Sequence, residues 1–219
     1  MNLNFKVKTN PLHNANYYLD TDFIGLDVTN AKKIFEEFAQ SLDKPLQVMI
    51  SSEEVENIEI LKVAGFTCKR KCYEVEAGIQ DYVGDKVEGK LLYSFAGEES
   101  YEQCRELMLD RYILTHRNIN PWTETKEEFF SELPECVVCF CMDGKLASFA
   151  FVEDDEIAYV WGNNVNVFRK FAQVLVIEMF RKYEVITFEA DDCDEIAMEL
   201  KGKFINQSEE SFDAYIREK

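Results

Sequence analysis

Residues 167–182 carry apolar side chains at the spacing of a helix that is buried along one face. These side chains are Phe168, Phe171, Ala172, Leu175, Val176, Met179 and Phe180. Three short apolar runs precede the stretch at 137–142, 146–152 and 156–161, separated by turn residues at 143–144 and 154–155. A buried helix directly after antiparallel strands predicts an α/β fold in which the helix packs on a mixed sheet.

The elements around this helix follow from the same kinds of pattern. A strand at 91–96, a helix at about 99–112, a loop at 115–122 and a short helix at about 124–131 precede the three strands, with Thr123 as the candidate N-cap of the short helix. After the long helix come a strand at 185–190, a helix at 193–202, and two strands around Phe204 and at 212–216. The predicted order from residue 91 onward is therefore βααβββαβαββ.

The front of the chain shows a similar pattern, with a helix at 31–42, a strand at 46–51, a helix at 53–64 and a strand at 72–77. A shift of 138 positions pairs Val48 with Ile186 and Phe66 with Phe204 without a gap. Part of this match is expected of any two strand–helix pairs, but we interpret it as an internal repeat. Residues 78–90 hold three of the nine glycines and form the predicted linker between a front domain, 1–77, and a rear domain, 91–219.

The charge balance limits the partners of this chain. It has 42 acidic and 24 basic residues and a formal net charge of −18, so it repels phosphate backbones and anionic lipids. We expect an acidic protein that binds neither nucleic acid nor membranes and favours cationic ligands. No apolar run approaches the ~20 residues of a membrane helix, and the first residues lack the apolar stretch of a signal peptide. The expected location is the cytoplasm.

The cysteines and histidines argue against a disulfide framework and against a metal site. The seven cysteines are odd in number and irregularly spaced, which is typical of reduced thiols in the cytoplasm. Cys139 and Cys141 share one face of a predicted strand and Cys136 lies on the other, with no second cysteine pair to complete four zinc ligands. With only two histidines in the chain, we expect neither a bound metal nor a cysteine nucleophile.

The element order from residue 90 to the end resembles that of the GNAT superfamily of N-acetyltransferases, and residues 1–77 resemble a truncated copy of the later half of that fold. The resemblance rests on the order of elements and covers most of the chain. It implies a tandem GNAT-like arrangement in which a partial, non-catalytic copy precedes a complete domain. It also implies acetyl-CoA as the acyl donor, held by the fourth strand and the helix that follows it.

Mapped onto this sequence, the resemblance places the acetyl-CoA site along the strand 156–161 and the start of the long helix. The implied contacts are Ala158, Val160, Trp161, Asn163, Asn164, Val165, Asn166, Val167, Phe168 and Arg169. The family pattern in this loop, Q/R-x-x-G-x-G/A, is missing its glycines, and Trp161 stands near the place of the arginine or glutamine. Asparagine tolerates a left-handed backbone, so the loop either keeps the family shape or is an ordinary Asn-rich start of a helix.

The catalytic candidates lie on the same strand. Acyl transfer to an amine needs a base, and Glu156 at the start of the strand is our choice; the alternative is a solvated turn carboxylate. Tyr159, the second candidate, would face away from Glu156 in a regular strand and share its face if the strand has a β-bulge. The tyrosine that serves as general acid in the family is replaced, at the matching count from Phe204, by Glu199.

His116, Arg117 and Trp122 in the loop after the first rear helix are the candidates for binding the acceptor. The resulting prediction is an N-acetyltransferase that transfers an acetyl group from acetyl-CoA to a primary amine of a small molecule or peptide. The alternative is a catalytically inactive GNAT-like module for ligand binding or protein interaction. The sequence leaves the oligomeric state open, a homodimer included.

Overall fold

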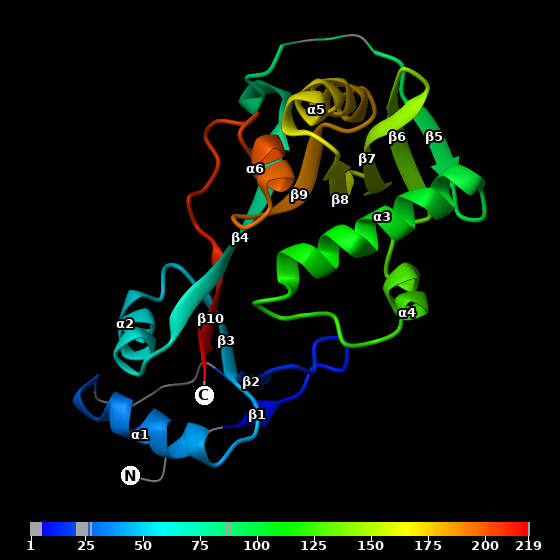
Figure 1. The fold of residues 1–219 in the computed structure, drawn as a ribbon. Coiled ribbons are helices and arrows are strands. Elements are labelled where there is room, and N and C mark those ends of the chain that lie inside the picture. Colours follow the sequence, from blue (N-terminus) through cyan, green and yellow to red (C-terminus); the bar gives the residue numbers. More distant parts are fainter. Residues whose placement is uncertain (1–5, 21–25, 27, 86, 88, 219) are drawn as a thin grey trace. The chain divides into compact units, whose positions relative to one another are not determined.

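The computed structural model describes residues 6–20, 26, 28–85, 87 and 89–218. Contacts divide the chain into two compact units (Figure 1). The first comprises the residues up to 72 together with 115–124 and 210–219, and the second comprises 73–114 and 125–209. Among the described helices, none combines the length and the apolarity that crossing a membrane requires.

The first unit is a small sheet with two helices on it. Its strands are β1 (Val7–Lys8), β2 (Tyr17–Leu19), β3 (Leu46–Ser51), β10 (Phe212–Arg217) and the first half of β4 (Thr67–Gly78), and they lie in the order β1-β2-β3-β10-β4. The pair β2–β3 is parallel, whereas β10 runs antiparallel to both neighbours. The helices α1 (Val28–Gln40) and α2 (Val55–Val63) close an apolar core around the fully buried Phe35 and Leu61.

The second unit has the strand order β4-β9-β8-β7-β6-β5. Its elements are η1 (Ile79–Asp81), β5 (Leu92–Phe95), α3 (Glu99–His116), α4 (Lys126–Ser131), β6 (Cys136–Met142), β7 (Lys145–Glu153), β8 (Glu156–Gly162), α5 (Val165–Phe180), β9 (Val185–Asp191) and α6 (Glu195–Lys201). Figure 1 shows α5 and α6 on one face of this sheet and α3 on the other. The strands are mostly antiparallel, but β8 and β9 are parallel, so the sheet is mixed.

The long helix and its strands agree with the sequence pattern. The helix α5 buries the predicted apolar face, and Phe171, Leu175 and Met179 are at most 4% exposed in the core of the second unit. The mixed α/β fold and the three antiparallel strands before α5 are confirmed. Local periodicity was enough to predict these elements, because apolar side chains recur along each of them at the spacing of its buried face.

Three expectations about single elements were wrong. The residues around Phe204 form only an isolated bridge to Tyr82 and no strand. The N-cap of α4 is Thr125, which accepts from the Glu128 N–H, because the Thr123 hydroxyl instead binds the Pro11 carbonyl at 3.2 Å. The helix α3 continues to His116, so residues 115 and 116 form its last turn.

Two strands belong to units that their place in the chain does not indicate. The last strand, β10, inserts between β3 and β4 in the first unit, where it pairs with both. The second half of β4 belongs to the second unit, in whose core Val75 and Ala77 are at most 2% exposed. The compact units therefore differ from the segments 1–77 and 91–219, and the description of those segments as two copies of one ancestral fold stays a prediction.

Candidate functional site

A β-bulge in β8 determines which side chains share a face of the second unit's sheet. Phe151 on β7 pairs with Tyr159, and Val152 pairs with Ile157, so Ala158 is the extra residue between two regular pairs. The bulge puts Glu156 and Tyr159 on the same face, while the next side chains along the strand point into the core beneath α5. The condition under which the two catalytic candidates would share a face is therefore met.

The parallel pair β8–β9 is joined only where the strands begin. The pairing consists of Glu156 with Thr187, and the Thr187 N–H donates to the Asp155 carbonyl at 3.0 Å. At the other end of β8, Gly162 lies against α5 and α6, where an added Cβ would stand 2.9 Å from Phe168 and 3.3 Å from Ile196. The two strands are thus paired where they begin, and at its other end β8 packs against α5 and α6 through Gly162.

Acidic side chains surround the start of β8. Partial desolvation raises the pKa of Glu156, and the charges of Glu189, Glu153 and Asp155 raise it further. A carboxylate in such surroundings binds a proton more readily than an isolated one and attracts cations. This part of the sheet therefore combines a strengthened base with a negative field.

Tyr159 lies deeper on the same face, against Phe129 of α4 at a ring-centroid distance of 6.4 Å. Burial raises the pKa of its hydroxyl, and the negative charges of Glu132, Glu189 and Glu156 act in the same direction. The hydroxyl consequently stays protonated at neutral pH. It can donate a hydrogen bond or a proton beside the carboxylate of Glu156.

The start of α5 is capped by its own sequence. Asn164 is the N-cap, and its side-chain oxygen accepts from the N–H groups of Asn166 at 2.9 Å and Val167 at 3.4 Å. Among the described residues, non-glycine left-handed backbone occurs at 143, 154 and 206, so these asparagines do not imitate a glycine loop. The structure thus has the ordinary Asn-capped start of a helix that the sequence left as an alternative.

The side chains of the other members of the predicted cofactor set differ in burial. Val160 and Phe168 are buried in the core under α5. Trp161 stacks on Phe149 with a centroid distance of 5.2 Å and an interplanar angle of 7°. At the turn into α5, Asn163 is exposed and Val165 is half-buried. The exposed side chains of this set are the polar ones, Asn163, Asn164, Asn166 and Arg169, whereas Ala158, Trp161, Val165 and Val167 are half-buried.

Glu199 on α6, which stands where the family has its tyrosine, forms an ion-pair cluster. It accepts from Arg169 at 2.8 and 2.9 Å and lies 2.6 Å from the Lys203 ammonium. The hydrogen bond from Arg169 chiefly lowers the pKa of Glu199 to about 2. The position therefore holds a permanent carboxylate that cannot act as a general acid, and it draws Arg169 toward α6.

A second ion pair connects α3 with the start of α6. The Arg111 Nε donates to the Asp194 carboxylate at 2.9 Å, and the guanidinium makes a second, shorter contact with the other oxygen. Sequence reasoning missed this pair because the two residues are 83 positions apart. The one local signal was Asp194 itself, a typical N-cap directly before a helical pattern.

The three predicted acceptor-binding residues belong to the first unit, whereas Glu156 and Tyr159 belong to the second. His116 Nε2 lies 3.1 Å from Arg70 Nη1, and its Nδ1 lies 2.9 Å from the Thr115 hydroxyl. Because a guanidinium only donates, the His116 Nε2 is the acceptor in this contact. Trp122 packs edge-on against the His13 ring at 5.5 Å, and Arg117 is exposed.

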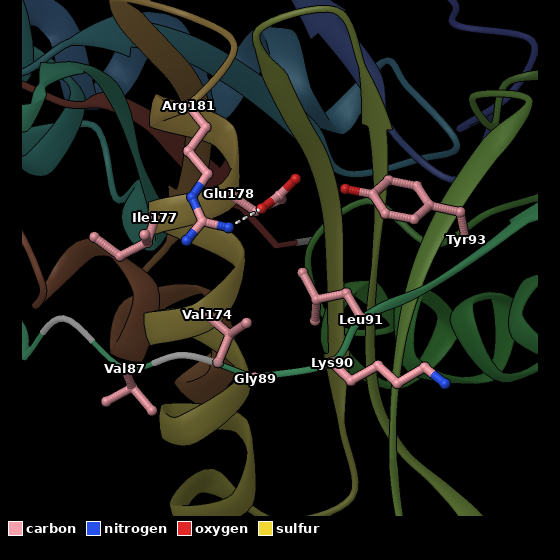
Figure 2. Close-up of a pocket in the computed structure, with 9 residues that line it drawn as sticks. All are labelled: Val87, Gly89, Lys90, Leu91, Tyr93, Val174, Ile177, Glu178 and Arg181. Carbon is pink, nitrogen blue, oxygen red and sulfur yellow. Dashed lines mark hydrogen bonds and ion pairs between the residues drawn. The ribbon is translucent and has the colours of Figure 1, made fainter.

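A cavity of about 400 Å³ lies elsewhere in the second unit, between α5 and the segment that contributes Val87, Gly89, Lys90, Leu91 and Tyr93 (Figure 2). Its wall includes Leu91, Val174 and Ile177, and at its rim Arg181 donates to Glu178 at 2.8 Å. None of the predicted site residues lines it. In the described part of the chain, no three His, Cys, Asp or Glu side chains are grouped closely enough to hold a metal ion.

No protein-family model matches the chain, and no curated protein matches it. Solved structures do. A GCN5-related N-acetyltransferase from Sphaerobacter thermophilus gives a TM-score of 0.56 at 9% identity over 98% of this chain and 76% of that protein. An acetyltransferase of the GNAT family from Colwellia psychrerythraea gives 0.52 at 11% identity over 100% and 82%. A conserved protein from Enterococcus faecalis, described as a probable N-acyltransferase, gives 0.53 at 9% identity over 98% and 57%.

These identities are too low to transfer a substrate or a catalytic residue, but the likeness extends over nearly the whole chain. The part of the chain that is alike includes the start of β8, where Glu156 pairs with Thr187 of β9, and the β-bulge at Ala158. The structural neighbours are GNAT-family N-acetyltransferases. This chain has the mixed α/β fold of the GNAT N-acetyltransferases.

Proposed function

We propose that the second unit is an N-acyltransferase that moves an acetyl group from acetyl-CoA to a primary amine of a small molecule or peptide. The observation that carries the proposal is the Ala158 bulge, which puts Glu156 and Tyr159 on one face of β8, with Glu156 at the point where β8 pairs with β9. A base and a proton donor next to each other are what amine acylation needs.

The residues available to an acyl-CoA donor fit it in part. The β8–β9 pairing is at Glu156 and Thr187, before residues 158–161 of β8. The helix α5 directs its positive end toward the end of β8. The N–H groups at residues 165–167 would hold phosphate oxygens if Asn164 released the two that it caps. When bound, the thioester supplies an activated acyl group that an amine can attack without a covalent enzyme intermediate.

The chain's own groups then have distinct tasks. Glu156, with its raised pKa, accepts a proton from the ammonium form of the substrate, and the acids around it favour a cationic acceptor. The Tyr159 hydroxyl stays protonated and can return a proton on the same face. Tyr159 thereby takes the task that Glu199, ionised beside Arg169, cannot perform.

A second candidate function is a non-catalytic GNAT-like module that binds a ligand or a protein. It is favoured by one set of contacts: Asn164 caps two of the N–H groups at the start of α5, and Glu199 holds Arg169. Both arrangements satisfy groups that would otherwise bind a pyrophosphate. The two proposals differ in whether acetyl-CoA binds at all.

The partners and the location remain part of the proposal. The net charge of −18 supports a cationic small-molecule acceptor and argues against nucleic acid or a membrane surface as a partner. We propose the cytoplasm as the location, from the irregular set of cysteines. A homodimer is compatible with the fold.

The test measures acetyl-CoA binding and turnover separately. Acetyl-CoA at 1 mM should raise the melting temperature, because a ligand that binds only the native state stabilises it. Turnover against a panel of diamines and polyamines is followed by chromatography of free CoA, since exposed cysteines would react with thiol reagents. Glu156→Gln should lower kcat about 100-fold, whereas the matched variant Glu184→Gln, at an exposed acid whose charge is not among those that raise the pKa of Glu156, should retain activity. Absence of a thermal shift at millimolar acetyl-CoA would select the non-catalytic module.

A further inference from the structure

Cys104 and Cys139 bring their sulfur atoms within 3.6 Å of each other inside the second unit. Cys104 lies on α3 and Cys139 in the middle of β6, and their exposed fractions are 0% and 3%. Both are free thiols. In a disulfide the sulfur atoms are about 2.05 Å apart, so a bond between Cys104 and Cys139 requires the two sulfur atoms to approach each other by about 1.5 Å.

Both cysteines are attached to firmly held backbone. Cys139 pairs with Leu92 on β5 and with Phe149 on β7, so β6 is fixed on both edges at this point. One turn before Cys104, the Tyr101 hydroxyl donates to the Pro134 carbonyl at 2.9 Å, which anchors α3 beside the sheet. The contact between the sulfur atoms therefore follows from the packing of a helix on a sheet and persists as long as the unit is folded.

We propose that Cys104 and Cys139 form an oxidation site, in which a peroxide converts the two thiols into a disulfide that ties α3 to β6. This site is separate from the acyl-transfer proposal because Cys139 lies on β6, two strands away from Glu156 and Tyr159 on β8, although all three share one face of the sheet. A pair of thiols in contact is the arrangement that allows a second sulfur to react before the first is over-oxidised.

The local electrostatics assign the two sulfurs different roles. The hydrogen bond between the two thiols lowers the pKa of Cys139, against the opposing effect of burial. The same hydrogen bond raises the pKa of Cys104, and burial raises it further. Cys139 is therefore the sulfur that attacks the oxidant, and Cys104 is the one that resolves the product.

The reaction balances with hydrogen peroxide as the oxidant. The Cys139 sulfur attacks one peroxide oxygen, the O–O bond breaks, and one water leaves as Cys139 becomes a sulfenic acid. The Cys104 sulfur then attacks the sulfenic sulfur and loses its proton, the S–O bond breaks, and a second water leaves. Two thiols lose two electrons and two protons in total, and one peroxide is reduced to two waters.

The cross-link should stabilise the second unit. It closes a loop between residues 35 positions apart in the sequence, which restricts the unfolded chain more than the folded one. We expect the oxidised protein to melt about 5 to 10 °C above the reduced protein. Dithiothreitol should restore the original melting temperature.

The experiment maps the disulfides of the full chain after exposure to hydrogen peroxide at low protein concentration. Trypsin releases Cys104 in the peptide 91–105 and Cys139 in the peptide 127–145, which also contains Cys136 and Cys141. The double variant Cys136→Ser/Cys141→Ser leaves Cys139 as the only partner in that peptide. We expect the linked peptide pair, two mass units below the sum of the free peptides, in the wild type and in this double variant.

Two outcomes would overturn the proposal. One is absence of the linked pair in the double variant under conditions that oxidise the exposed Cys193 in the same sample, which shows that the oxidant was active. The other is a linked pair that survives in Cys139→Ser, since Cys104 would then react with a neighbour. Because the double variant changes only partly or fully exposed cysteines, its result does not depend on whether Cys139→Ser folds.

Discussion

Arg111 on α3 and Asp194, the N-cap of α6, form a two-point ion pair whose side chains are only 14% and 13% exposed. The Asp194 carboxylate also accepts from the N–H groups of Ile196 at 2.8 Å and Ala197 at 3.2 Å. A single carboxylate thus caps one helix and binds another. Because the pair is mostly buried, its loss should change the free energy of unfolding more than the loss of an exposed ion pair would.

The two tasks of Asp194 can be separated by substitution. Asp194→Asn keeps an acceptor for the N-cap and removes the charge, and we expect a loss of about 1 to 3 kcal/mol because the mostly buried Arg111 loses its ion pair with Asp194. Asp194→Ala should cost about 1 kcal/mol more through loss of the cap. Urea unfolding curves provide the measurement. Equal stability of both variants and the wild type would mean that the pair contributes nothing.

The core face of α5 is tested by Leu175, which is 1% exposed. Leu175→Ala should lower the free energy of unfolding by about 2 to 5 kcal/mol, because it removes buried methyl groups and leaves a cavity. The matched change on the exposed face of the same helix, Lys170→Ala, should stay within about 0.5 kcal/mol of the wild type. A loss below about 1 kcal/mol for Leu175→Ala would show that this face is not the core.

Because the ion pairs of Glu199 lower its pKa, we expect the protein to lose stability in acid. Arg169 chiefly lowers its pKa from 4.5 to about 2 in the folded protein. The unfolded chain binds the proton more readily, so the stabilisation is present above about pH 4.5 and is lost as the pH falls through 4.5 toward 2. At pH 7, Glu199→Gln should cost about 1 to 2 kcal/mol, since the half-exposed Arg169 weakens the pair.

The check is a series of urea titrations of the wild type and Glu199→Gln between pH 3 and pH 7. The difference in unfolding free energy between the two proteins should shrink as the pH falls below 4.5. A difference that does not change with pH would show that the carboxylate acts through packing and not through its charge.

Asn166 tests where a CoA pyrophosphate binds. Asn166→Asp puts a carboxylate beside the start of α5, so the dissociation constant for CoA should rise about tenfold by Coulomb repulsion. Folding should change little, because acids are favourable in a first helical turn. Calorimetric titration of CoA and melting curves of both proteins give the two values. Equal CoA affinity in the variant would place the ligand elsewhere.

The elements of the second unit could be predicted because their signals are local. The helix α5 and the strands β6, β7 and β8 each record in their own side chains which face is buried. The bulge at Ala158 has no such signal, since an extra residue in a strand changes pairing without changing composition. The sequence raised it only as a condition for Glu156 and Tyr159 to share a face.

The site was harder to predict because its contacts join distant residues. Counting positions identified Glu199 as the residue in the tyrosine's place, but Arg169, which pairs with it, is 30 positions away. His116 and Trp122 were expected in one loop beside an acceptor. Instead, α3 extends to His116, and the following residues pack on the segment near His13, so both residues became part of the first unit.

The position of β10 between β3 and β4 has a consequence for synthesis on the ribosome. The first unit is translated first, yet its sheet lacks an interior strand until residues 212–217 have been made. Leu46, for example, must wait for Arg217, with which it pairs. Nascent chains should therefore expose the unpaired edges of β3 and β4 until the last strand has been made, and during this time those edges are open to pairing with other chains.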